Sequence, residues 1–492
     1  MDYLDPKKQA RHRIVLLVGY LLIGCGIVIA ALVLLYQAYG FGLGKNGNVI
    51  QNGLVFFSSH PSPAGIYVNG KLNKEQTNAR VVMQSGIYQI LLSREGYRDW
   101  QRTIEVDGGD VHHYDYPFLV PKKLTTKKVQ TYASAPPLAT QSPDRRWLVI
   151  GQPGSMTNFN VYDLKRPDKA PTALALPGSI LSKASGGESW QLGEWADDNS
   201  HVVLQHVYDG KFEYVLVDRE APSKSQNLNT TLSANPSKLT LLDKKYDQYY
   251  LYDQPSASLK RASLSAPAAV PVVNRVLAYQ AYADDSILYA SDDKAPAGKV
   301  AIRLKIGDQT YPIRTFPAGT SYLLDLAKYS DELYVAAGAA SQGKVYIFKD
   351  PPGQLQKLPK QAVVPVQVLR VNNPNYLSFS NSAQFIMVED GQQFGVYDFE
   401  NTKGFAYVTT QPLEPPQPHA TWMDGNRLAY VSQGKLTIFD YDNANPQTLV
   451  PASSSYLPAW SPDYKRLYTL VPGKTAGQTD LTQTLLVTPA DQ

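Results

Sequence analysis

Cysteine is almost absent from this chain: among 492 residues there is one, Cys25. A single cysteine forms no disulfide within its own chain and cannot supply the thiolate ligands of a structural zinc site. Packing must therefore stabilise the folded parts. Charge is also sparse, because Asp, Glu, Lys and Arg make up only 18% of the residues, whereas there are 33 tyrosines. Few charges and many aromatic residues favour an all-β chain over long solvated helices.

The familiar catalytic and nucleic-acid-binding signals are missing as well. The chain contains no G-x-S-x-G, no H-E-x-x-H and no P-loop. Half of its net charge of +4 comes from the first 13 residues, and no basic patch indicates nucleic acid. The sequence therefore predicts a chain that is not an enzyme, has no catalytic residues and binds no cofactor or metal ion.

Histidines give no clear site either. His201 and His206 lie near Glu194 and Asp197 in the sequence, which invites a metal-site interpretation. Side chains alternate along a strand, however, so two residues five positions apart would point to opposite faces. The side chains of the adjacent His112 and His113 would likewise point to opposite faces of a strand. We interpret all four histidines as structural or surface residues.

A long apolar run stands near the N-terminus. Residues 14–36 contain no charge, and 23 residues at about 1.5 Å each span about 35 Å, enough for a hydrocarbon core of about 30 Å. Four basic residues precede the run, and the first one after it is Lys45. This asymmetry predicts a cytoplasmic tail at 1–13, a transmembrane signal-anchor helix at 14–39, a linker at 40–52 and an extracytoplasmic remainder.

Two short motifs, one inside this apolar run and one just after it, could indicate a function other than membrane anchoring. Residues 22–25, LIGC, resemble the lipobox at which bacterial lipoproteins are cut and acylated. The apolar run continues for eleven residues past Cys25, though, where a lipoprotein turns polar. We therefore prefer a spanning helix, with lipidation as the alternative. Residues 42–47 match G-x-G-x-x-G but lack the preceding strand and following helix of a dinucleotide site, so we expect a flexible linker.

Residues 53–120 alternate short β-like runs with turn signals. Asn69-Gly70 is the strongest of these signals, because a type I′ hairpin turn needs positive φ at both central residues. The order V-N-G-K at 68–71, G-I-Y at 86–88 and E-G-Y at 95–97 resembles the PEGA domain family. The family's eponymous tetrapeptide is replaced here by Ser-Pro-Ala-Gly at 62–65. The resemblance implies a small immunoglobulin-like extracytoplasmic β-sandwich without catalytic residues, in which Gly96 and Tyr97 pack structurally.

The next stretch, residues 121–137, is rich in lysine and has no sustained apolar face. Its lysines could touch an acidic polymer or lipid headgroups. We prefer a solvated linker between two domains that fold independently.

From residue 138 to the end, a degenerate turn-and-strand pattern recurs. Its clearest copies are SPDRRWLVI from 142 and SPDYKRLYTL from 461, and the marker positions between them stand about 40 to 50 residues apart. The pattern resembles bacterial β-propellers of the Tol type and of the tryptophan-aspartate-repeat class. It predicts seven or eight blades at 138–492. The eight marker positions are Asp144, Asp197, Asp247, Asp285, Asp331, Ser382, Asp424 and Asp463.

Several aromatic residues share one register within this repeat. Trp195, Trp422 and Trp460 precede their markers by two or three positions, and Phe379 fills a similar place. Identical placement in successive repeats favours packing between blades over stacking on a glycan. The last apolar run, residues 482–488, is expected to close the ring by pairing with chain near 129–137 or the first blade.

Together these patterns indicate a single-pass cell-envelope protein with its N-terminus in the cytoplasm. We expect a propeller that serves as a non-enzymatic platform for a protein partner, with the PEGA-like module as a spacer. A carbohydrate or cell-wall binder is the alternative, and an enzyme whose site is assembled from loops is a third hypothesis.

Overall fold

The computed structural model describes residues 6–38, 41–43, 49–283, 286–358, 361–417 and 419–491. It divides into two compact units. The first unit comprises Met1–Lys123 and Val487–Asp491, and the second comprises Leu124–Leu486. The first unit is therefore built from both ends of the chain.

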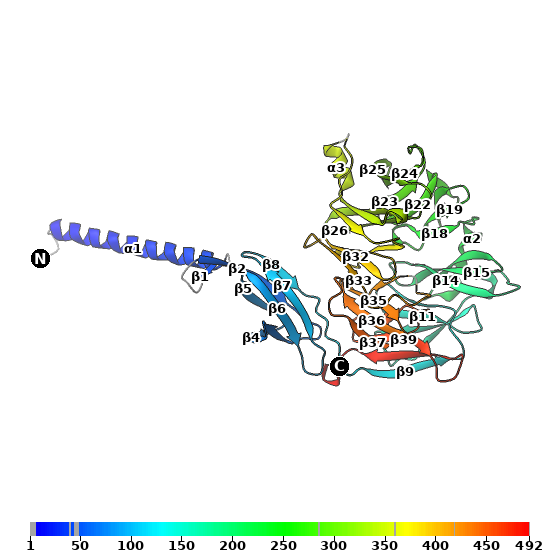
Figure 1. The fold of residues 1–492 in the computed structure, drawn as a ribbon, viewed down its shortest axis with the longest axis horizontal. Helices are drawn as coiled ribbons and strands as arrows, with labels where there is room; N and C mark the ends of the chain where they lie inside the picture. Colours follow the sequence, from blue (N-terminus) through cyan, green and yellow to red (C-terminus); the bar gives the residue numbers. More distant parts are fainter. Residues whose placement is uncertain are drawn as a thin grey trace. The chain divides into compact units, whose positions relative to one another are not determined.

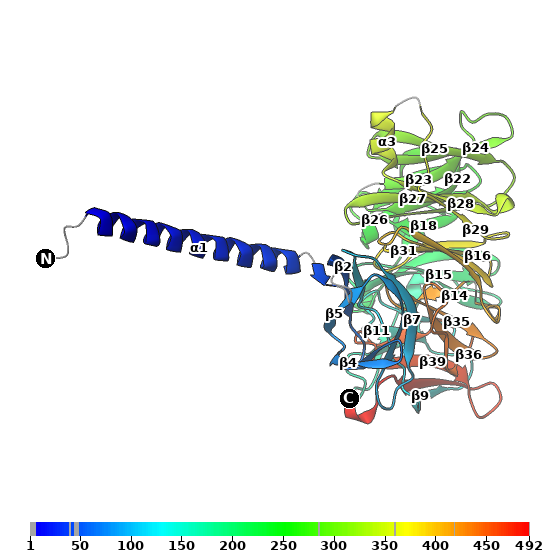
Figure 2. The ribbon, with the colours of Figure 1, turned by 60° about the vertical axis from the view of Figure 1, so that its left-hand side comes forward.

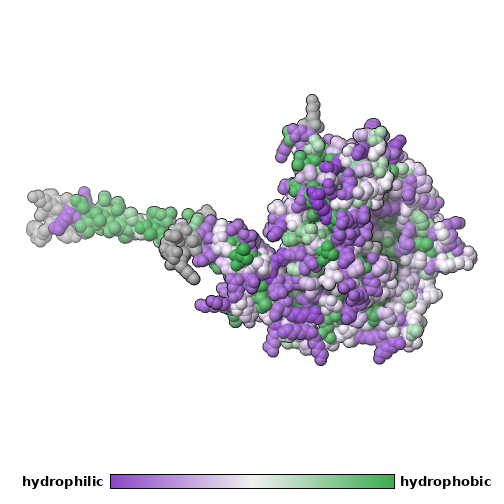
Figure 3. Space-filling view, viewed as in Figure 1, coloured by the Kyte–Doolittle hydropathy of each residue, from purple (hydrophilic) through white to green (hydrophobic). Residues whose placement is uncertain are grey.

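A single long helix, α1 (Pro6–Ala38), begins the described chain. Arg11–Tyr36 is long and apolar enough to cross a membrane by length and composition. Between Arg11 and Tyr36 the side chains are exposed around the helix and are mostly apolar, as the green surface in Figure 3 shows. A helix that is apolar all round is stable where lipid or protein covers it. It also begins earlier than predicted, because residues 6–13 continue the same helix.

The rest of the first unit is a sandwich of two four-stranded sheets. In one sheet β2 pairs antiparallel with β1 and β5 and parallel with β8, and in the other the order is β4-β3-β6-β7. The strands are β1 (Phe41–Leu43), β2 (Val49–Phe57), β3 (Gly65–Val68), β4 (Lys71–Gln76), β5 (Ala79–Gln84), β6 (Gly86–Ser93), β7 (Trp100–Val106) and β8 (Val111–Tyr114). Part of the predicted 40–52 linker is therefore strand, and residues 44–47 of the G-x-G-x-x-G segment lie outside the described residues.

The hairpin signal in this unit is confirmed. Asn69 and Gly70 have φ of 49° and 76°, and Val68 pairs with Lys71 across the turn. Both central residues have positive φ, as a type I′ turn requires. The side-chain carbonyl of Asn69 also accepts a 2.8 Å hydrogen bond from the amide of Gln89, which ties the turn to β6. Between the sheets lies a core that includes the fully buried Trp100.

The second unit is a β-propeller, and its described residues form eight four-stranded antiparallel sheets, one for each blade. This settles the open choice between seven and eight blades. In Figure 1 the blades follow one another in chain order, from cyan at β11 to red at β39. The first four blades are β10 (Ala139–Gln141), β11 (Trp147–Gly151), β12 (Asn158–Asp163) and β13 (Thr172–Ala175); β14 (Glu188–Trp195), β15 (His201–Tyr208), β16 (Lys211–Asp218) and β17 (Gln226–Asn227); β18 (Lys238–Leu241), β19 (Gln248–Asp253), β20 (Ser258–Ser263) and β21 (Val270–Asn274); β22 (Val276–Tyr282), β23 (Ser286–Ser291), β24 (Lys299–Ile306) and β25 (Gln309–Pro317).

Blades five to eight complete the ring. They are β26 (Tyr322–Tyr329), β27 (Glu332–Ala339), β28 (Lys344–Lys349) and β29 (Gln367–Arg370); β30 (Tyr376–Phe379), β31 (Phe385–Glu389), β32 (Gln393–Asp398) and β33 (Lys403–Val408); β34 (Thr421–Trp422), β35 (Arg427–Ser432), β36 (Lys435–Asp440) and β37 (Gln447–Pro451); β38 (Ala459–Trp460), β39 (Arg466–Pro472), β40 (Thr479–Leu485) and β9 (Thr125–Tyr132). Two short helices, α2 (Leu228–Thr231) and α3 (Pro351–Lys357), lie in connections.

The ring closes through a strand contributed by the other end of the unit. β9 pairs antiparallel with β40, with Thr479 opposite Tyr132 and Leu485 opposite Thr125. Both views show the cyan β9 in the red blade (Figures 1 and 2). The predicted closure by the C-terminal strand is confirmed, although this strand ends at Leu485. Residues 487–491 belong to the first unit instead.

Strand β9 also corrects the predicted 121–137 linker. Residues 125–132 form the outer strand of the last blade, and the ammonium of Lys128 lies 3.7 Å from the carboxylate of Asp480 on β40. The reason for the error is that an outer strand is exposed on most of its surface, so it lacks the apolar alternation that marks a strand buried on one face. No linker of that length separates the two units.

The repeated marker is a tight turn between the first two strands of a blade. In the last blade the amide of Ser461 donates to the carbonyl of Arg466, and the Ser461 hydroxyl accepts from the Arg466 amide, both at 2.9 Å. The hydroxyl of Ser142 accepts from the Trp147 amide at 3.0 Å in the first blade. This side-chain bond explains why a serine follows the first strand directly in both blades. Of the eight markers, Asp285 lies outside the described residues.

Candidate functional site

The aromatic residues predicted to pack between blades do so. Trp195 and Trp460 are 7% and 4% exposed, while Trp422 and Phe379 are partly buried. The indole nitrogen of Trp195 donates to the Thr140 hydroxyl at 2.8 Å, and that of Trp422 donates to Ser378 at 3.1 Å, each on the preceding blade. The buried rings of Trp195 and Trp460 are not available to stack on a sugar.

The two histidines of β15 make separate contacts. His206 is fully buried between two carboxylates: its Nδ1 lies 2.9 Å from Glu213 and its Nε2 lies 2.8 Å from Glu188. His201 Nδ1 lies 2.6 Å from Asp198, and its ring stacks on Tyr246. Glu194 and Asp197, the acids named from the sequence, are thus not their partners.

Burial raises the pKa of Glu213, but hydrogen bonds from Ser182, His206 and Asn227 outweigh this effect, so its pKa lies below the ordinary value. Glu213 is therefore charged at neutral pH and stabilises the buried imidazole. No group of three or more metal-binding side chains occurs among the described residues. The histidine pair on the sandwich also lies near acids, with His112 3.4 Å from Asp110 and His113 3.7 Å from Asp115.

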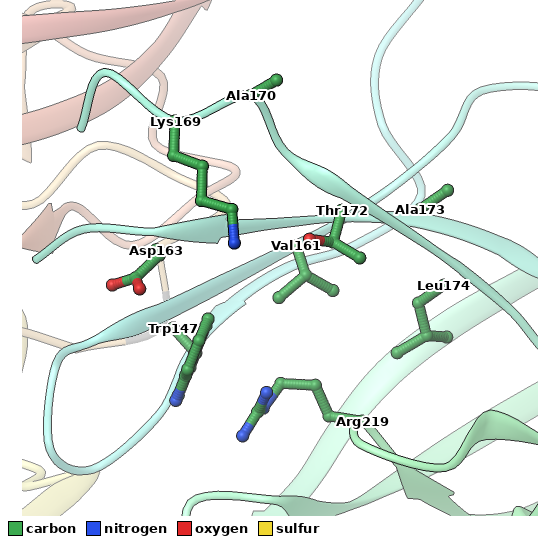
Figure 4. A pocket seen from close by; sticks show the side chains of 9 residues that line it. All are labelled: Trp147, Val161, Asp163, Lys169, Ala170, Thr172, Ala173, Leu174 and Arg219. Carbon is green, nitrogen blue, oxygen red and sulfur yellow. The ribbon is translucent and has the colours of Figure 1, made fainter. Parts of the chain in front are cut away.

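A pocket of about 110 Å³ opens at the seam between the first two blades. Three strands of the first blade form its floor and walls, and one arginine comes from the second blade (Figure 4). Sequence inspection missed this site, because its residues come from two blades and carry no motif. The lining residues are Trp147, Val161, Asp163, Lys169, Ala170, Thr172, Ala173, Leu174 and Arg219.

Two successive turns after β12 place Lys169 at this pocket. The amide of Arg166 donates to the carbonyl of Asp163 at 2.9 Å, and the amide of Lys169 donates to the carbonyl of Arg166 at 3.0 Å. The Asp163 carboxylate also accepts from the Lys165 amide at 3.1 Å, which fixes the first turn. The chain thereby folds back before entering β13, whose Thr172 pairs with Val161.

The one carboxylate in the pocket is already neutralised. Arg146 holds Asp163 through two hydrogen bonds of 3.2 and 3.0 Å. Partial burial raises the pKa of Asp163, but the bonds from Arg146 and Lys165 outweigh it and bring the pKa below the ordinary value. Asp163 is charged at neutral pH, and both of its oxygens are occupied.

Arg219 is the opposite wall and is held in place. Its side chain is 10% exposed, its Nε donates to the carbonyl of Asn199 at 3.3 Å, and its Nη2 contacts Ser200 and Glu220. Its guanidinium carbon lies 4.0 Å from the centre of the Trp147 ring, and that of Arg146 lies 4.4 Å from the same ring. Cations over an indole are attracted by its quadrupole, so the two arginines and Trp147 form one rigid cluster.

A second cluster of unusual groups lies between blades six and seven. Glu389 pairs across the sheet with Tyr376, whose ring stacks on His419 at 3.7 Å. Oε1 of Glu389 accepts from the amide of Ala420 at 2.7 Å, while Oε2 has no hydrogen-bond partner among the described residues. Burial raises the pKa of Glu389 to about 7 and lowers that of His419. Since Glu389 is fully buried, we interpret it as a structural group that titrates near neutrality.

Asp325, on the inner strand β26, has a similarly altered acidity. The residue as a whole is partly exposed. Burial of its carboxyl group by the surrounding protein raises the pKa of Asp325 to about 7. Its carboxylate accepts hydrogen bonds from the amide of Phe379 on the next blade at 3.0 Å and from that of Leu326 at 2.9 Å. These contacts join the inner strands of blades five and six, so we interpret Asp325 as a bond between blades.

Comparison with known families identifies one part of the chain. The model of the PEGA domain family matches residues 52–119. The segment is a PEGA domain. The match agrees with the resemblance at 53–120 and with the two-sheet sandwich described above. No curated protein sequence matches the chain.

Solved structures similar to this one are β-propellers. The Dos1 propeller has a TM-score of 0.45 at 14% identity, over 73% of this chain and 94% of that one. Hsv2 of Kluyveromyces lactis has a TM-score of 0.38 at 9% identity, over 71% and 97%. An oligogalacturonate lyase in complex with manganese has a TM-score of 0.40 at 10% identity, over 75% and 100%.

These neighbours correct the prediction that the chain is not an enzyme. That prediction rested on absent motifs, yet one of the similar structures is that of an enzyme, an oligogalacturonate lyase. Absence of the familiar motifs therefore does not exclude an enzyme, since a site assembled from separated residues has no motif. The comparison assigns no activity to this chain, since 10% identity shows the fold alone.

Proposed function

We propose that this chain is a membrane-anchored binding protein that holds its propeller outside the cytoplasm for a protein partner, with the PEGA domain as a spacer. The observation that carries the proposal is the order of its parts: an apolar helix with basic residues before it, then the PEGA domain, then a closed ring. The flanking charges favour a cytoplasmic N-terminus. A closed ring supplies a rigid frame on which loops from many blades can form a binding surface.

The carbohydrate alternative has less support. Its candidate stacking residues included Trp195 and Trp460, and both are buried between blades. In the pocket between blades one and two, the guanidinium groups of Arg146 and Arg219 already lie over the Trp147 ring. Stacking on a sugar needs an open aromatic face, and the two guanidinium groups occupy the Trp147 ring.

Site-specific cysteine labelling tests the topology. In a Cys25→Ser background, a cysteine replacing the exposed Ala268 on the propeller should react with a membrane-impermeant maleimide in intact cells. A cysteine replacing Gln9 in the N-terminal segment should react only after lysis. Labelling of both positions only after lysis would contradict an extracytoplasmic propeller.

Photo-cross-linking tests the partner. A benzophenone amino acid is introduced in turn at exposed loop positions of every blade in the full-length anchored chain. The proposal expects discrete protein adducts from neighbouring positions on one part of the propeller and none from the opposite part. Absence of an adduct from every position would contradict a stable protein partner.

A further inference from the structure

We propose that the pocket between blades one and two, lined by Trp147, Lys169 and Arg219, binds a carboxylate of a partner peptide. This inference rests on the proposed function and specifies the chemistry that the partner presents. The pocket would receive one acidic side chain or one C-terminal carboxylate.

The first argument is the balance of hydrogen-bonding groups. Three donors on residues that line the pocket have no hydrogen-bond partner within the described chain: the ammonium of Lys169, Nη1 of Arg219 and the indole nitrogen of Trp147. The only carboxylate, Asp163, has both oxygens engaged by Arg146. Free donors with no free carboxylate select a ligand that is rich in acceptors.

The net charge of the pocket also favours an anionic ligand. Arg146 is neutralised by Asp163, and Arg219 contacts the exposed carboxylate of Glu220, whereas Lys169 forms no ion pair within the described residues. One positive charge is therefore uncompensated at the pocket. In Figure 4 the Lys169 and Arg219 side chains reach in from different sides of Val161 and Thr172, so an anion placed there would face both. Hydrogen bonds from charged donors to a carboxylate are the stronger kind.

Size and lining restrict the ligand further. A volume of about 110 Å³ is below the roughly 300 Å³ at which small-molecule sites begin, but it accommodates a single side chain or chain end. Val161 and Leu174 are apolar and buried, so they suit a methylene stem. Ala170 and Ala173 are small and exposed, which leaves room for a peptide main chain beside β13.

Strand β13 offers a further contact. It is the outermost strand of its sheet, so no other strand of the described chain pairs with its outer edge. An extended peptide can add to such an edge through main-chain hydrogen bonds while one side chain enters an adjacent pocket. The combination of an open strand edge and a cationic pocket fits a peptide, because an extended peptide can pair with the edge and place a carboxylate in the pocket at the same time.

Fluorine NMR of the full-length anchored chain, labelled with fluorotryptophan, tests the proposal. The six tryptophans give separate reporters, and Trp147→Phe identifies the resonance of Trp147. The probes are three acetylated tripeptides and galacturonate: Ala-Glu-Ala amide, Ala-Gln-Ala with a free C-terminus, and Ala-Gln-Ala amide. We expect a saturable shift of the Trp147 resonance with one or both carboxylate peptides and none with the neutral peptide. The responding peptide identifies the source of the carboxylate.

The Lys169→Gln variant should bind the responding peptide about tenfold more weakly, because it loses a charged hydrogen-bond donor. The matched control is Lys435→Gln, at an exposed position on blade seven, which should bind as the wild type does. Equal shifts with the neutral peptide, a larger shift with galacturonate, no shift with any probe, or unchanged binding by Lys169→Gln would each overturn the proposal. The propeller would still serve a partner elsewhere if cross-linking gave discrete adducts at other blades.

Discussion

Tyr97 donates a 2.7 Å hydrogen bond from its hydroxyl to the carboxylate of Asp491, although 394 positions separate the two residues. The amide of Thr488 donates to the same hydroxyl at 2.8 Å, and Arg94 pairs with Asp491. These contacts explain why residues 487–491 belong to the PEGA-containing unit. The chain leaves that unit after Lys123 and returns to it at Val487, so two covalent connections join it to the propeller.

Removing the Tyr97 hydroxyl should loosen the C-terminal segment. Tyr97→Phe is expected to destabilise the first unit by about 1 to 2 kcal/mol, because the variant loses its bonds to Thr488 and Asp491 while the ring still packs. Carboxypeptidase digestion of the folded protein should then remove residues after 486 faster. Tyr88→Phe is the matched control, since its hydroxyl bonds only to the Gln84 carbonyl of the same unit. Equal digestion rates for both variants would contradict this role of Tyr97.

The closing strand gives a second prediction. Leu481 on β40 is 1% exposed and packs with Tyr132, Leu148 and Leu470 across the closure of the ring. Leu481→Ala should cost about 2 to 5 kcal/mol, as truncation of a buried leucine does. Leu457→Ala, at a side chain 48% exposed, should change the free energy of unfolding little. Chemical denaturation followed by tryptophan fluorescence measures both, and an equal effect of the two variants would argue against a closed ring.

Some of these features were predictable from sequence, for physical reasons. The marker turn is recognisable at Ser142 and Ser461 because their hydroxyls bond to the backbone within the turn itself. The Asn69 hairpin is similarly local. In contrast, β9 is polar on most of its surface, and only its register with β40 shows that it is a strand. The pocket combines Lys169 with Arg219 from another blade, so no spacing in the sequence indicates it.

Buried carboxyls are equally hard to predict. Glu389 ends a strand, where an exposed carboxylate is usual, and only the packing of Tyr376 and Ala420 around it shows that it is enclosed. The acidity of Glu389 thus depends on a neighbouring strand of its own blade and on Ala420, which leads into the next blade.

Glu389 predicts a dependence of stability on pH. Its pKa is about 7 in the folded chain and has an ordinary value of 4.5. The folded state therefore holds a proton that the unfolded state has released, so stability is full below pH 4.5 and falls as pH rises through 7. The loss is about 3 kcal/mol when complete, at about 1.4 kcal/mol per pKa unit.

The variant Glu389→Gln removes this titration. Relative to the wild type, it should gain stability between pH 5 and pH 8, as measured by urea denaturation at each pH. The comparison cancels the contribution of Asp325, which titrates in the same direction. Glu332→Gln, whose side chain is 44% exposed, should follow the wild-type pH profile. A parallel profile for Glu389→Gln and the wild type would mean that Glu389 is charged in the folded chain.

The last prediction concerns the anchor, where a spanning helix and acylation at Cys25 lead to different outcomes. Helix α1 continues to Ala38, well past Cys25, and its exposed side chains after that residue include Ile27 and Leu32. If the helix itself is the anchor, Cys25→Ser should remain in the membrane fraction after carbonate extraction. A double change, Ile27→Lys with Leu32→Lys, should abolish this retention, because each lysine near the centre of a spanning helix costs about 2.5 to 3.5 kcal/mol. Release of Cys25→Ser would indicate a lipid anchor at the cysteine and would contradict the spanning helix.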